Sequence, residues 1–223
     1  MFSMEKLTNN IAEKIGSELG LDKDGKEVIA YGTFAILQTL LSIAVTVITG
    51  YSFGVLTETL IVSFTIIILR KYSGGIHASS PGICAVVSAV VAVGQALLIV
   101  FIITPLISFK IVIILGLLSF SWSYYIIYKL CPVDSAAKPI KTIKKRQRMK
   151  KASIFILWVY VVIVLLSSIM YLHTGEIRFL TYSLCIYGGS IWQSFTLTHG
   201  GHITIQQIDT FIHKFLNFIR RRK

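Results

Sequence analysis

Long apolar stretches recur along most of this chain, and they limit what it can fold into. Five of them approach the roughly 20 residues that a helix needs to cross a bilayer. They cover residues 28–50, 51–69, 82–104, 106–128 and 152–172, and a sixth, more polar stretch covers 179–198. The mean hydropathy of +0.74 and the 14% share of charged residues exclude an ordinary soluble domain. Backbone in lipid must satisfy its own hydrogen bonds, so the sequence predicts an all-α polytopic membrane protein with about six transmembrane helices.

Both ends of the chain show the pattern of an amphipathic surface helix. The apolar positions are Leu7, Ile11, Ile15 and Leu19 at the start and Ile208, Phe211, Ile212, Phe215 and Ile219 at the end. No secretory signal precedes the first apolar stretch, so we expect that span to stay uncleaved. Without internal repeats or a low-complexity linker, residues 1–223 are predicted to form a single integral membrane domain.

Lysine and arginine gather in alternate loops, and such loops stay on the cytoplasmic side. Arg70 and Lys71 mark one loop, residues 129–151 a second, and the C-terminus a third. Six spans with both termini in the cytoplasm of the cell satisfy every loop. The net charge of +12 is therefore interpreted as anchoring to anionic lipid, with an acidic peptide partner as the alternative, and no nucleic acid is implied.

The three cysteines, Cys84, Cys131 and Cys185, have no disulfide or zinc spacing. Cys131 and Cys185 are interpreted as small core residues. His199 and His202 resemble a metal pair, but no third ligand is near, so we expect a connector there. Neither a metal nor another cofactor is expected.

Cys84 differs because Ser80 and Pro81 before it are typical of a helix start. Cys84 then falls in the first turn, where unpaired N–H groups and the helix dipole favour a thiolate. The same N–H groups can hold an oxyanion. A nucleophile for acyl transfer is therefore predicted at this position.

A base for that nucleophile is available seven residues upstream. Gly74 and Gly75 permit a tight turn that folds His77 back over Cys84. The alternative is that His77 is simply solvated in a loop.

The stretch RKYSGGIHASSPGIC resembles the signature of the accessory gene regulator B family, membrane-embedded cysteine endopeptidases that process quorum-sensing propeptides. CPVDSAAKPIKTIKKRQRMKK resembles the basic loop that follows the fourth span in that family. By this resemblance His77 and Cys84 occupy the catalytic positions, at the cytoplasmic face, while Arg70 and Gly75 belong to the surrounding motif.

The resemblance also implies the reaction and the partners. Cys84 would cleave off the C-terminal tail of a propeptide through a thioester, and a residue of the retained peptide would then close a thiolactone or lactone ring. Family substrates carry an amphipathic helix and an acidic tail, which Lys144, Lys145 and Arg146 are candidates to attract. A homodimer is implied as well.

Two other classes of protein stay open at this point. Glu58 is the acidic residue well inside an apolar stretch, and a carboxylate there is costly unless it is neutral or paired. It is a candidate to orient His77, to bond a neighbouring helix, or to couple ions in a small six-span transporter. A membrane adaptor without chemistry is the other alternative.

Overall fold

The structure is a computed structural model that describes residues 4–75, 81–133 and 142–221, and within them the chain is helical without a strand, which confirms the all-α class. The α-helices are α1 (Met4–Glu18), α2 (Lys23–Ser52), α3 (Leu56–Ser73), α4 (Pro81–Leu97), α5 (Phe109–Leu130), α6 (Ile143–Thr174), α7 (Arg178–Phe195) and α8 (His199–Arg221). A π-helical segment, Leu98–Ile103, and a 3₁₀ turn, Thr104–Leu106, extend α4.

Four helical segments of the described ranges are long and apolar enough to cross a membrane. They are Lys23–Ser52, Gly82–Leu106, Phe109–Leu130 and Ile143–Thr174. Helices α3 and α7, which match the second and sixth predicted spans, have 18 residues each and are outside this set. Charged residues of α3 and polar residues of α7 lower their hydropathy. The six-span count therefore stays a prediction for these two helices.

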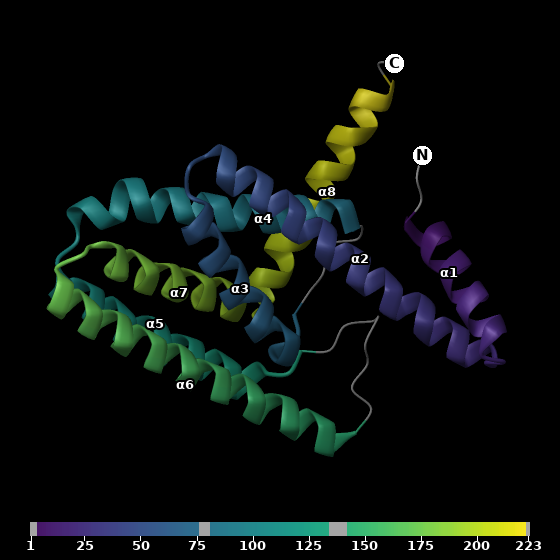
Figure 1. Cartoon of the computed structure of the whole chain (residues 1–223), viewed down its shortest axis with the longest axis horizontal. Coiled ribbons are helices and arrows are strands. Elements are labelled where there is room, and N and C mark those ends of the chain that lie inside the picture. The colour runs from purple at the N-terminus through teal and green to yellow at the C-terminus, as the bar shows by residue number, and fades with distance from the viewer. Residues whose placement is uncertain (1–3, 76–80, 134–141, 222–223) are drawn as a thin grey trace.

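Helix α7 lies inside the bundle, between α3 on one side and α5 with α6 on the other (Figure 1). Its polar side chains Ser183, Ser190 and Gln193 are fully buried. Protein packing thus shields from lipid a helix that is too polar to face it. Gly189 permits the close approach to α3, because a Cβ there would lie 2.8 Å from the Thr65 Cβ atom.

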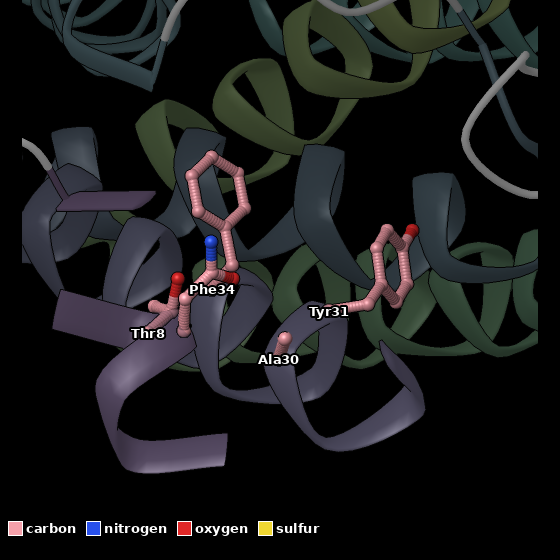
Figure 2. Close-up of a pocket in the computed structure, with 5 residues that line it drawn as sticks. Thr8, Ala30, Tyr31 and Phe34 are labelled. Carbon is pink, nitrogen blue, oxygen red and sulfur yellow. The ribbon is translucent and has the colours of Figure 1, made fainter. Parts of the chain in front are cut away.

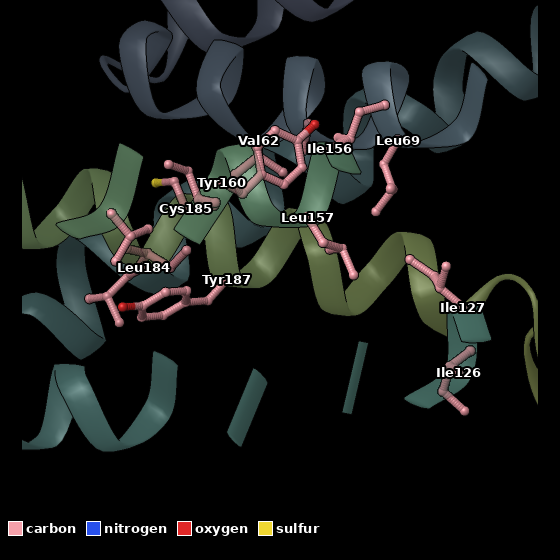
Figure 3. Packing of buried hydrophobic residues seen from close by; sticks show 14 of the residues in the cluster. Val62, Leu69, Ile126, Ile127, Ile156, Leu157, Tyr160, Leu184, Cys185 and Tyr187 are labelled. Carbon is pink, nitrogen blue, oxygen red and sulfur yellow. The ribbon is translucent and has the colours of Figure 1, made fainter. Parts of the chain in front are cut away.

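The core is formed by apolar side chains of α3, α5, α6 and α7 that meet around this central helix (Figure 3). Val62 and Leu69 come from α3, Ile127 from α5, Leu157 from α6 and Leu184 from α7. Packing of these side chains brings the last turn of α3 to the end of α5 and the start of α6, and this contact positions the candidate site.

The terminal helices α1 and α8 form where amphipathic helices were expected, and their placement on the membrane surface stays a prediction. Helix α1 packs on α2 through the buried residues Thr8 and Ala12, whereas Ile15 and Leu19 of the expected stripe are exposed. Small side chains allow the two helices to pack closely. Helix α8 projects from the bundle toward the C-terminus (Figure 1), and its first turn contains His199 and His202, which were expected in a connector.

Candidate active site

Cys84 lies in the first turn of α4, which begins at Pro81. The helix start predicted from the sequence is thereby confirmed. Cys84 is partly exposed, whereas Cys131 and Cys185 are buried. Among the three cysteines, Cys84 is therefore the one that a reactant can reach.

Arg70, in the last turn of α3, lies close to Cys84 in space. Burial lowers the pKa of the Arg70 guanidinium, and the charge of the Cys84 sulfur raises it. The structure thus adds a cationic side chain to the helix-terminal position of Cys84.

The double glycine after α3 adopts a backbone that other residues rarely adopt. Gly74 has φ 76° and Gly75 has φ 129°. A Cβ at Gly74 would collide with the carbonyl oxygen of Val133, and a Cβ at Gly75 would lie 3.2 Å from the Thr196 hydroxyl. Both glycines are therefore required by conformation and by the closeness of their neighbours.

The turn pairs with the segment that follows α5. Gly74 and Val133 form an isolated parallel bridge, in which the Val133 N–H donates to the Ser73 carbonyl at 3.0 Å. The Arg146 side chain of α6 donates to the Pro132 carbonyl at 3.2 Å. The two motifs that carried the family resemblance, which lie about 60 residues apart in the chain, are thus in contact at one place.

Gln193 of α7 holds the same turn from inside the bundle. Its Nε2 atom donates to the Ser73 hydroxyl and to the Gly74 carbonyl, each at 2.9 Å. The side chain is fully buried. The sequence placed Gln193 inside an apolar stretch, and this alone was a signal, because a buried amide needs hydrogen-bond partners. The sequence did not distinguish Gln193 from the other glutamines in such stretches.

Cys131 lies beside this cluster as a structural residue. Its thiol donates to the Ser153 hydroxyl at 3.3 Å. Burial raises the pKa of the Cys131 thiol, while the Ser153 hydrogen bond and the charges of Lys150 and Arg146 lower it. Burial is the largest of these effects, so the neutral thiol is favoured, in keeping with the core role expected of it.

Some of the remaining predicted site residues lie within the described ranges, and others lie outside them. His77 and Ser80 lie outside them. Lys144 and Lys145 are exposed in the first turn of α6, so part of the expected basic loop is helical. Glu58 lies in the first turn of α3, about 18 Å along the helix from Arg70.

A shallow pocket between α1 and α2 is separate from these residues (Figure 2). Thr8, Asn9, Ala30, Tyr31 and Phe34 line it. None of them is a candidate catalytic residue, so this hollow does not mark the site.

The fold and the site define an all-helical integral membrane protein with an accessible cysteine where a spanning helix begins. A model of the family described as accessory gene regulator B matches residues 8–197. The chain is 41% identical over 213 residues to Putative AgrB-like protein 2 of Clostridium perfringens (strain 13 / Type A), which covers 96% of this chain and 100% of the relative. The chain therefore belongs to the accessory gene regulator B family, and this membership supports a role in the accessory gene regulator system.

Two further relatives agree with this assignment. A Putative AgrB-like protein of Clostridium perfringens (strain SM101 / Type A) matches with the same identity and coverage. A Putative AgrB-like protein of Clostridium acetobutylicum is 25% identical over 151 residues, 68% of this chain and 69% of the relative. No solved structure shows a significant match to the chain.

Proposed function

We propose that this protein is a membrane-embedded cysteine endopeptidase that removes the C-terminal tail of a short quorum-sensing propeptide. The observation that carries the proposal is the position of Cys84, partly exposed in the first turn of α4 and close to Arg70. Family membership supports the same reaction class. We place the reaction at the cytoplasmic face of the membrane, with both chain termini on that side.

In the proposed mechanism His77 takes the proton of the Cys84 thiol, and the sulfur attacks the peptide carbonyl at the cleavage position. Backbone N–H groups of the first turn of α4 stabilise the oxyanion. The tail leaves as an amine after it receives the proton from His77, and the retained peptide stays on Cys84 as a thioester. A thiol of the retained peptide then attacks this thioester, which closes a thiolactone and frees Cys84. A serine hydroxyl would close a lactone.

The substrate in this proposal carries an amphipathic helix and an acidic tail. The helix would lie on the anionic lipid surface, and the tail would approach the exposed Lys144 and Lys145. Arg146 contributes charge as well, although its side chain also holds the Pro132 carbonyl.

The test uses purified protein in lipid vesicles and a synthetic propeptide with an amphipathic start, an internal cysteine and an acidic tail. We expect Cys84→Ala to abolish tail release, and Cys185→Ala, a matched change at a buried cysteine, to retain it. A propeptide whose internal cysteine is replaced by alanine should accumulate as a thioester on Cys84, visible as a mass shift of the protein. Tail release by Cys84→Ala would overturn the proposal, because the cleavage would then not need the Cys84 sulfur. Transport of the uncleaved peptide by both the unchanged protein and Cys84→Ala, with no tail release by either, would indicate a transporter instead.

A thiol-reactive probe separates an enzyme from an adaptor without chemistry. At neutral pH we expect iodoacetamide to label Cys84 faster than Cys131, because burial raises the pKa of the Cys131 thiol. Labelling of Cys131 should rise only as the pH exceeds the ordinary thiol range. Equal rates at neutral pH would indicate that Cys84 is structural.

A further inference from the structure

We propose that Gln193 is a positioning residue for the peptidase reaction, because its buried carboxamide fixes the Ser73–Gly74 turn from which the chain runs to His77. This inference rests on the proposed function. Gln193 lies on α7, about 120 residues from the turn in sequence, and neither motif of the family resemblance contains it.

The hydrogen bonds determine how the carboxamide is oriented. The Gly74 carbonyl only accepts hydrogen bonds, so the amide nitrogen of Gln193 must face it. The same nitrogen donates to the Ser73 hydroxyl, also at 2.9 Å. The other side-chain atom, Oε1, is buried and has no hydrogen-bond partner among the residues that the structure describes. The contacts of the carboxamide within these residues are therefore made by its donor side.

Neighbouring groups hold the Gln193 side chain against the turn. The Thr196 hydroxyl donates to the Gln193 carbonyl at 2.7 Å, and Thr196 is itself fully buried. Gly75 lies against both residues, because a Cβ there would be 3.5 Å from Gln193 Nε2 and 3.2 Å from Thr196 Oγ1. One turn of α7 thus supports the double glycine from inside the bundle.

Chain connectivity transmits this support to His77. Only three peptide units join Gly74 to His77, a reach of about 11 Å at most, and four more join His77 to Pro81, where α4 begins. The residues at both ends of this short connection are held in place. Gln193 and Val133 hold Gly74, and Pro81 is part of α4. Loss of the Gln193 hydrogen bonds would leave the first end held by Val133 alone and let it shift. A misplacement of about 1 Å between reacting groups costs about 100-fold in rate.

The first experiment compares Gln193→Ala with Gln95→Ala in vesicles, with the synthetic propeptide described above. Gln95 is a glutamine of α4 that lies against Gly188 of α7 instead of against the turn, and it serves as the matched control. We expect Gln193→Ala to lower kcat about 10- to 100-fold with KM within about twofold, whereas Gln95→Ala retains both. Iodoacetamide labelling of Cys84 at neutral pH should also slow in Gln193→Ala. An unchanged kcat in Gln193→Ala would overturn the inference.

The second experiment uses Gln193→Glu, which keeps the shape of the side chain and makes its donor titratable. A protonated carboxyl has one O–H to donate to Gly74, and a carboxylate has none. The measured quantity is the ratio of the Gln193→Glu rate to the rate of the unchanged protein, each per folded molecule. This ratio should therefore rise as the pH falls and decline as the pH rises. For Gln193→Ala the same ratio should not vary with pH. A ratio that stays as low as that of Gln193→Ala at every pH would indicate a role in packing alone and overturn the inference.

The two proposals fail in different ways. If Cys84→Ala releases the tail, the proposed function is wrong whatever Gln193 does. If Cys84→Ala is inactive and Gln193→Ala retains its kcat, the function stands and only the positioning role is wrong.

Discussion

Gly74 shows at the scale of one residue how the site depends on its neighbours. The backbone there is left-handed, and the space beside its Cα atom is filled by the Val133 carbonyl. The sequence explained the glycine pair by a tight turn that folds His77 over Cys84. The structure adds a second reason, the bridge to Val133, which no local pattern contains.

We predict that Gly74→Ala destabilises the protein by at least about 1–3 kcal/mol, the usual cost of strained backbone at a residue with a side chain. The collision with Val133 adds to this cost. Gly94→Ala is the control, because among the described residues nothing beyond its chain neighbours and the backbone of its own helix lies within 4 Å of a Cβ there, and alanine favours a helix. A fluorogenic thiol probe that reacts with Cys131 and Cys185 on unfolding measures the thermal midpoint, in a background with Cys84→Ser. Equal midpoints for the two variants would contradict the structure.

At the scale of elements, the starts of helices α4 and α6 were predicted unequally well. The start of α4 at Pro81 follows from a local rule, and the structure confirms it. The start of α6 at Ile143 was missed, because the lysines and arginines were interpreted as a loop. Lysine, arginine, glutamine and methionine all favour helix, so a helical reading of this segment was available from composition. Arg146 then joins α6 to the segment after α5.

The exposed charges of α6 should act through long-range attraction of an acidic tail. We predict that Lys144→Glu with Lys145→Glu weakens processing more at low salt than at high salt, because salt screens exposed charges. Arg146→Ala should lose activity at both salt concentrations, since it breaks a hydrogen bond to Pro132. Rates at 50 mM and 500 mM salt provide the measurement. An equal loss at both concentrations for the double reversal would indicate misfolding instead of lost attraction.

At the scale of the whole molecule, the burial of α7 separates this bundle from a simple row of spanning helices. Its polar residues face α3, α5 and α6, so a helix of modest hydropathy is shielded by protein. The charge pattern of the loops then sets the orientation that we propose.

This orientation predicts which turns a membrane-impermeant maleimide reaches in intact cells. Glu176→Cys, in the exposed turn between α6 and α7, should react from outside. Lys144→Cys should react only after the cells are permeabilised. Both variants are made in a background in which Cys84, Cys131 and Cys185 are replaced by serine. The opposite pattern would reverse the proposed topology and remove the reaction from the cytoplasmic face.

The sequence by itself determined the class of the protein and the local setting of Cys84. Apolar length, basic loops and a proline at a helix start act over a few residues, so they can be interpreted without a fold. Only the tertiary structure decided that Gly74 meets Val133 and that Gln193 holds the turn. These contacts join residues about 60 and 120 positions apart, and they form because the packing of α3, α5 and α7 brings the helix ends together. A local pattern carries no information on which distant partner a buried polar group will find.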